Sequence, residues 1–199
     1  MQIGSKLVLA SHNDHKIAEM KLLLAPLDLE VLSVKELEIS TVEETGNTFE
    51  DNAAIKAEHG FAETNMPTLA DDSGLVIPAL GGMPGVDTNP WAMEQGGYPQ
   101  AFAKLEELLQ GKDHACYFIC MMALKLPGQD VQFYEGRIDG HLSFPPRGKV
   151  GFGYDPIFVP EGYDQTYAEL SETSKIKLAH SHRSRAIEAI VKACQQKAS

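Results

Sequence analysis

The sequence predicts an α/β fold built on a mixed β-sheet. Short apolar runs alternate with segments of helical periodicity through the first half of the chain. Two long apolar runs then flank the turn at 127–130, which predicts an antiparallel hairpin. At 199 residues, with neither an internal repeat nor a clear linker, the chain is expected to form one domain over residues 1–199.

The first elements follow a strand, loop, helix, strand order. Residues 6–10 form an apolar run that predicts a buried strand, and a second strand is expected at 30–34. Between them, residues 15–25 carry apolar side chains at helical spacing. Asn13 or Asp14 can cap this helix, so the polar loop lies at a helix N-terminus.

The next segment predicts a loop at 38–47 and a helix at 48–64. Thr48 and Asp51 form an approximate capping box at the start of this helix. A brief strand at 68–70 is expected to end at the Asp71-Asp72-Ser73-Gly74 sequence. The residues from 81 to 99, rich in Gly, Pro and Asn, predict a long loop. The remaining expected elements are a helix at 101–109, strands at 114–126, 131–138 and 157–159, and a final helix at 184–195.

Composition narrows the classes of partner. There are 17 lysines and arginines against 28 aspartates and glutamates, a net charge of −11, which argues against binding nucleic acid or an anionic membrane. The longest apolar stretch, 115–124, is too short to span a bilayer, and the first apolar run is too short for a signal peptide. With three cysteines expected to be reduced thiols, we expect a cytoplasmic protein.

Acidic side chains concentrate in the first half of the chain and basic ones near its end. Between residues 28 and 72 acids greatly outnumber bases, whereas from 175 onward the reverse holds. An acidic segment and a basic segment on one fold suit a ligand that carries both phosphate and a divalent metal. The alternative is that both segments are solvated surfaces. Adjacent carboxylates at Asp71 and Asp72 point to opposite faces of an extended chain, so one can bind Mg²⁺ or activate water. An Asp-rich turn is the alternative, and Glu43-Glu44 either completes the metal site or lies on the surface.

Three further segments could bind a nucleotide. The loop from Ser11 to Lys16 precedes a helix, where backbone N–H groups favour phosphate, although it lacks the P-loop pattern. Its histidines are metal ligands or surface residues. Phe152 lies between two glycines and can stack on a base or pack in a tight turn. Lys177 and Ser181-His182-Arg183 offer hydrogen-bond donors to phosphate or carbonyl oxygens, or they form a charged helix start.

In their order along the chain, these motifs resemble the inosine triphosphate pyrophosphatase family nearly from end to end. The matching segments are Ser11-x-Asn13-x-x-Lys16-x-x-Glu19, Glu43-Glu44-Thr45-Gly46-x-Thr48-Phe49, Asn52-Ala53 with Lys56-Ala57, Ala70-Asp71-Asp72-Ser73-Gly74-Leu75, Gly81-Gly82-x-Pro84-Gly85, Gly151-Phe152-Gly153-Tyr154-Asp155-Pro156-Ile157-Phe158 and Ser181-His182-Arg183.

The resemblance implies Mg²⁺-dependent hydrolysis of non-standard purine nucleoside triphosphates (ITP, dITP, XTP) to monophosphate and pyrophosphate. It implies a long mixed sheet flanked by helices, two lobes with the active site in the cleft between them, and a homodimer. Asp72 would be the general base, ionised because a neighbouring metal keeps its pKa low, and Glu43 and Asp72 would be metal-linked acids. The substrate-binding residues would be Ser11, His12, Asn13, Asp14, His15, Lys16, Lys56, Ser73 and Lys177, with Phe152, Gly153, Tyr154, Asp155, His182 and Arg183 at the base.

The chain departs from the family pattern at three places. His12 stands where many relatives have Gly, and residues 86–91 lack the Arg that bacterial relatives usually have there. The segment before Lys177 is two residues longer than usual, so Lys175 is a rival for the family lysine. Two other functions are alternatives: that of a nucleotide pyrophosphatase of septum-formation-inhibitor type with a different base preference, and that of a catalytically weak nucleotide-binding regulator.

Overall fold

The computed structural model describes residues 3–173 and 180–195, and the chain divides into two compact units. The first unit comprises residues 1–72, 120–136 and 183–199, and the second comprises residues 73–119 and 137–182. In the described part of the chain, none of the helices has the length and apolar character needed to cross a membrane. Three strands, β3, β4 and β5, contribute residues to both units.

A six-stranded sheet forms the framework, in the order β2-β1-β3-β4-β5-β6. The strands are β1 (Lys6–Leu9), β2 (Glu30–Ser33), β3 (Thr68–Val76), β4 (Ala115–Lys125), β5 (Gln132–Leu142) and β6 (Phe158–Pro160). Strand β1 pairs in parallel with β2 and with β3, whereas β5 and β6 are antiparallel. This arrangement confirms the predicted mixed sheet.

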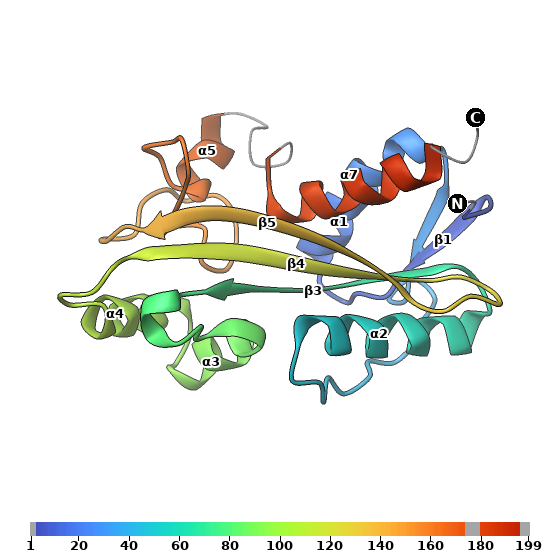
Figure 1. Cartoon of the computed structure of the whole chain (residues 1–199), viewed down its shortest axis with the longest axis horizontal. Coiled ribbons are helices and arrows are strands. Elements are labelled where there is room, and N and C mark those ends of the chain that lie inside the picture. The colour runs from blue at the N-terminus through green and yellow to red at the C-terminus, as the bar shows by residue number, and fades with distance from the viewer. Residues whose placement is uncertain (1–2, 174–179, 196–199) are drawn as a thin grey trace. The chain divides into compact units, whose positions relative to one another are not determined.

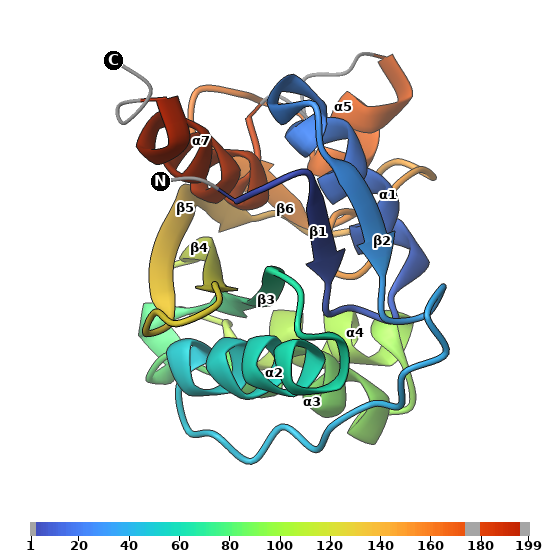
Figure 2. The same ribbon diagram turned by 90° about the vertical axis from the view of Figure 1, so that its right-hand side faces the viewer.

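In the first unit, helices cover both faces of the sheet (Figures 1 and 2). Helices α1 (Asp14–Leu24) and α7 (His182–Gln195) lie on one face, where Met20 and Ile190 pack in a buried cluster with Leu69 of β3. Helix α2 (Phe49–Thr64) lies on the other face, where its alanines pack with Ala70. Successive residues of β3 therefore belong to opposite layers, as the pleat of a strand requires.

In the first unit, a side chain caps each of the two helices for which the sequence predicted a cap. The Asn13 side chain accepts hydrogen bonds from the N–H groups of His15 and Lys16 at 3.0 and 3.2 Å. The Thr48 hydroxyl accepts from the Asp51 N–H at 3.1 Å. Such caps each contribute about 1 kcal/mol, and they also fix the two loops that precede the helices.

In the described part of the second unit, three α-helices pack around a core of aliphatic and aromatic side chains. They are α3 (Thr88–Glu94), α4 (Tyr98–Leu108) and α5 (Tyr167–Thr173), with 3₁₀ turns at η2 (Pro78–Leu80) and η3 (Gly85–Asp87). Phe118 of β4 contacts Phe158, with ring centroids 4.6 Å apart. The buried Tyr154 donates from its hydroxyl to the Thr88 carbonyl at 3.0 Å, which ties the 151–156 loop to α3.

Two expectations about secondary structure were wrong, and one helix was missed. Strand β3 does not end at Asp71 but continues through Gly74 to Val76, because its apolar residues pack on both sides of the aspartates. The segment 81–99 contains α3 and the first residues of α4 rather than one long loop. Helix α5 was not predicted at all.

Candidate active site

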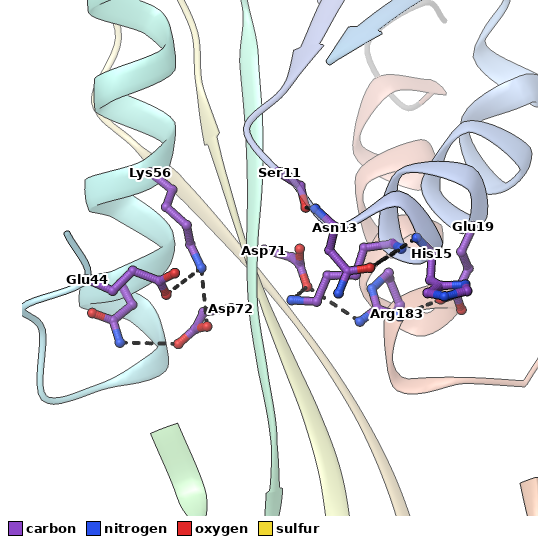
Figure 3. Close-up of polar contacts among 11 residues, drawn as sticks. Ser11, Asn13, His15, Glu19, Glu44, Lys56, Asp71, Asp72 and Arg183 are labelled. Carbon is purple, nitrogen blue, oxygen red and sulfur yellow. Dashed lines mark hydrogen bonds and ion pairs between the residues drawn. The ribbon is translucent and has the colours of Figure 1, made fainter. Parts of the chain in front are cut away.

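Two neighbouring aspartates in the middle of β3 point to opposite faces of the sheet. Figure 3 shows Asp71 on the side of Arg183 and Glu19, and Asp72 on the side of Lys56 and Glu44. Both residues are buried. The sequence predicted opposite faces from the alternation of an extended chain, and the structure confirms this and excludes the alternative of an Asp-rich turn.

Helix α2 supplies two partners for Asp72. Lys56 Nζ lies 3.3 Å from Asp72 Oδ1, and Asn52 Nδ2 donates to Asp72 Oδ2 at 3.4 Å. Asn52 and Lys56 are four residues apart, so they share one face of the helix. Each carboxylate oxygen accepts one long hydrogen bond, which leaves acceptor capacity for a further group.

The acidic loop before α2 is anchored against the same cluster. Glu44 Oε2 accepts from Lys56 Nζ at 2.7 Å, and the Asn52 side-chain oxygen accepts from the Gly46 N–H at 2.8 Å. A Cβ at Gly46 would lie 2.4 Å from the Asp51 Cβ, so only glycine lets the loop pass this close to α2. Glu43 is exposed. The structure therefore brings Glu44, rather than Glu43, to the partners of Asp72.

Burial and neighbouring charges act in opposite directions on these groups. Burial raises the pKa of the Asp72 carboxyl, an effect that Lys56 and Lys16 only partly offset. Burial lowers the pKa of Lys56, but Asp72, Asp71 and Glu44 outweigh it and raise that pKa. We expected a low pKa for Asp72. The neighbouring protein groups leave the pKa of Asp72 raised, so a bound cation would be needed to lower it.

On the opposite face, Asp71 is held by two cations. Lys16 Nζ lies 2.9 Å and Arg183 Nη2 lies 3.5 Å from the same oxygen, Asp71 Oδ2. Arg183 also contacts Glu19 of α1 through Nη1. Burial alone would raise the pKa of Asp71, but Lys16, Arg183 and Lys56 hold it far below its usual range. Asp71 is therefore a fixed negative charge.

The loop between β1 and α1 holds most of the predicted phosphate-binding residues. The Ser11 hydroxyl accepts from the Asn13 N–H at 3.3 Å, and Asn13 caps α1. His12 contacts the Ile39 carbonyl through Nε2 at 2.9 Å, and Asp14 forms an exposed ion pair with Lys35. His15 is exposed. The Ser11 and Asn13 side chains already accept from the N–H groups of residues 13, 15 and 16, so what the loop offers an anion is the positive end of the α1 dipole.

In the second unit, an aspartate organises the loop that carries Phe152. The Phe152 N–H donates to Asp155 Oδ2 at 2.9 Å, and Asp155 is buried. Gly151 and Gly153 both have positive φ, +104° and +62°. Phe152 is half-buried, whereas Tyr154 lies in the core of the unit, where its ring meets that of Tyr98 edge-on.

The remaining predicted residues are divided between the two units. His182 lies in the second unit, stacked on Phe118 with ring centroids 5.0 Å apart, whereas Arg183 lies in the first. Ser73 is half-buried at the start of the second unit. Lys177 and its rival Lys175 lie outside the described residues. One cleft shared by all these side chains stays a prediction.

Sequence reasoning gave no role to two residues that the structure brings into these clusters. Asn52 links Asp72 to the acidic loop, and its spacing from Lys56 was the available signal. Glu19 contacts Arg183, a residue 164 positions away, and its place three residues after Lys16 was the only hint. In the described residues, no group of three His, Cys, Asp or Glu side chains forms a preassembled metal site.

Comparisons with known proteins match the chain over nearly its whole length. The sequence model of the Ham1 family matches residues 7–193. The chain is 40% identical to a dITP/XTP pyrophosphatase of Bradyrhizobium diazoefficiens over 97% of both chains, and 42% identical to one of Agrobacterium fabrum over 94% of this chain and 95% of the other.

Solved structures give the same result. A HAM1 protein from Coxiella burnetii superimposes with a TM-score of 0.87 at 37% identity, covering 97% of this chain and 100% of that one. The Ham1 protein of Staphylococcus aureus superimposes with a TM-score of 0.85 at 32% identity, covering 96% of this chain and 99% of that one. The resemblance read from the motifs is thereby confirmed, and with both the sequence and the fold matched over nearly their whole length, the chain belongs to the Ham1 family.

Proposed function

We propose that this chain hydrolyses non-standard purine nucleoside triphosphates (ITP, dITP and XTP) to the nucleoside monophosphate and pyrophosphate. The observation that carries the proposal is the buried Asp72 carboxylate, held by Lys56 and Asn52 beside an acidic loop. The names of the relatives, dITP/XTP pyrophosphatase, supply the substrate class.

Hydrolysis of a phosphoanhydride requires a positioned water and neutralisation of phosphate charge. Asp72 is the proposed general base, because its oxygens retain acceptor capacity for a water beyond the bonds from α2. Lys16 and the N-terminus of α1 are the proposed phosphate contacts. Asp71 supports this role, since it fixes the ammonium of Lys16, which is a residue of the first turn of α1.

A divalent cation fits the Asp72 face. The carboxylates of Asp72 and Glu44 already converge on one positive charge, the Lys56 ammonium, and carboxylate oxygens are the ligands that Mg²⁺ prefers. Asp72 with Glu43 or Glu44 would hold the ion, which when bound neutralises charge on the phosphate oxygens. The sequence proposed Glu43, and the position of Glu44 makes it the stronger candidate.

Base recognition by Phe152, His182 and Arg183 stays a prediction. Phe152 is accessible enough to stack on a purine, and stacking distinguishes poorly between bases. Discrimination between a 6-oxo and a 6-amino group then needs edge contacts from donors such as those of His182. The Arg183 guanidinium is buried between Glu19 and Asp71, which gives it a second role that the sequence did not indicate.

The test is pyrophosphate release from ITP, dITP, XTP, GTP and ATP, with and without Mg²⁺. We expect preference for the first three, dependence on Mg²⁺, and a loss of at least about 100-fold in kcat for Asp72→Asn. Asp72→Asn is isosteric, so its circular dichroism spectrum should match the wild type. Preference for modified pyrimidine triphosphates would favour the septum-formation-inhibitor type, and binding without turnover would favour the regulator. Near-normal turnover in Asp72→Asn would show that Asp72 is not the general base.

Two further predictions concern the protein in the cell. The homodimer and the cytoplasmic location implied by the family and the composition are part of this proposal. Light scattering on the purified chain measures the first, and fractionation of the source cells measures the second.

A further inference from the structure

Four charged side chains of the first unit form a continuous chain of ion pairs. Glu19 contacts Arg183, Arg183 reaches Asp71, and Asp71 holds Lys16. Both cations approach the same oxygen, Asp71 Oδ2, at 3.5 and 2.9 Å. The four side chains come from α1, α7 and β3, and Figure 3 shows Glu19, Arg183 and Asp71 together on one side of β3.

The two middle members of this chain of ion pairs are the most deeply buried, and Lys16 at one end is the most exposed. The side chains of Asp71, Arg183 and Glu19 are 1%, 2% and 10% exposed, whereas that of Lys16 is 20% exposed. Buried ions must be paired, and removing one partner leaves the other uncompensated. The three buried groups therefore form a rigid base, and Lys16 is the member whose side chain is most exposed.

Glu19 determines how the Arg183 charge is shared. The guanidinium lies between two carboxylates and contacts Glu19 more closely than Asp71. Without the Glu19 charge, the whole Arg183 charge would fall on Asp71 Oδ2, the atom that holds Lys16. Because Glu19 and Lys16 are three residues apart on α1, the helix also fixes the distance between the two ends of the chain of pairs.

We propose that Glu19 is a positioning residue that acts through Arg183 and Asp71 to aim the Lys16 ammonium at a triphosphate. The inference rests on the proposed function in one respect, that Lys16 binds phosphate. It gives a role to the last residue of the Ser11-to-Glu19 motif, and it gives Arg183 a function that needs no contact with the base.

The test compares Glu19→Gln with a matched control. Gln keeps the size and a hydrogen bond to Arg183 but removes the charge. We expect KM for ITP to rise about threefold to tenfold, the scale of an indirect electrostatic coupling, with kcat within about twofold of the wild type. Glu36→Gln is the control, because Glu36 also binds a lysine of α1, Lys21, but at an exposed site. Its KM should not change.

A double variant separates positioning from a merely structural role. In a Lys16→Gln background, Glu19→Gln should raise KM no further, since the residue through which it acts is already gone. Glu19→Asp, which retains the charge, should recover at least half of the effect. If Glu19→Gln does not fold, Glu19→Met, which also removes the charge at a similar size, takes its place, and a KM equal to that of the wild type then overturns the proposal.

Four results would overturn it: an unchanged KM, a lowered KM, an equal rise with and without Lys16, or a fall in kcat parallel to a fall in Tm. The affinity for inorganic tripolyphosphate, measured by calorimetry on the same variants, should follow the KM values. If the wild type releases no pyrophosphate from ITP, the proposed function fails. The calorimetric series still tests Glu19 in that case.

Discussion

The two glycines that flank Phe152 differ in the space available for a side chain, although they are only two residues apart. Gly151 has φ +104°, and a Cβ there would lie 2.3 Å from Asp155 Oδ2. That oxygen is the acceptor for the Phe152 N–H. Gly153 has φ +62°, within the left-handed region, and its nearest neighbour would be Tyr98 at 3.7 Å. We therefore predict that Gly151→Ala is far more damaging than Gly153→Ala.

The magnitude follows from two contributions. Both variants pay about 1–2 kcal/mol for placing an L-residue at positive φ. Gly151→Ala also displaces Asp155 and loses a hydrogen bond to a charged acceptor, about 1.5–3 kcal/mol more. For a chain of this size, an excess of about 2 kcal/mol corresponds to about 4–8 °C in Tm. The same distortion moves the backbone of Phe152, so KM should rise more than about tenfold.

Differential scanning calorimetry and pyrophosphate release from ITP measure the two effects. Gly153→Ala is the control, because it adds the same methyl group to the same loop. Equal losses of Tm and equal KM values in the two variants would show that Asp155 does not hold the loop in the way described. A large loss of Tm with an unchanged KM in Gly151→Ala would instead remove this loop from substrate binding.

Three other predictions are accessible. Glu44→Gln should raise the Mg²⁺ concentration needed for half-maximal activity more than Glu43→Gln does. The reverse order in a metal titration would make Glu43 the better candidate for the metal ligand. Phe152→Ala should raise KM for ITP and ATP alike, since stacking is blind to the base, and a changed ratio of kcat/KM would contradict this. The bond to Lys21 lowers the pKa of Glu36 to about 2, so Glu36 stabilises the fold above pH 4.5 and loses this effect as the pH falls from 4.5 to 2. The Tm difference between wild type and Glu36→Gln, which corresponds to under about 1 kcal/mol at this exposed site, should therefore be small at pH 2 and vanish below it. A difference that stays constant with pH would contradict the assignment.

Periodicity predicted most strands and helices, but it failed where tertiary contacts create an element. Helix α3 has seven residues and contains Pro90, too little for periodicity to be visible. It forms because the Thr88 hydroxyl accepts from the Leu75 N–H at 2.9 Å and Ala92 is buried in the core. Neither contact can be read from local sequence, because the bond joins residues 13 positions apart and the burial of Ala92 depends on the packing of the whole cluster.

The same limit applies to the site. The opposite directions of Asp71 and Asp72 follow from strand geometry and were predicted. The partners were not, because Glu19 and Arg183 are 164 residues apart and no local pattern pairs them. Asn52 is an intermediate case. Its four-residue spacing from Lys56 placed both on one face of a helix, but which carboxylate they meet depends on the packing of α2.

Core packing also decides which of the two aspartates is available for chemistry. Leu69 packs with the apolar residues of α1 and α7, whereas Ala70 packs with the alanines of α2. Because side chains alternate along a strand, Asp71 must follow Leu69 toward the first layer and Asp72 must follow Ala70 toward the second. The register with β1, in which Leu69 lies opposite Leu9, holds this arrangement. A shift of the β3 register by one residue would move every side chain of the strand to the opposite face of the sheet. Ala70 would then be buried in the layer that Leu69 fills. The separation of an electrostatic anchor at Asp71 from a proposed base at Asp72 is therefore enforced by the apolar residues before them, not by the carboxylates themselves.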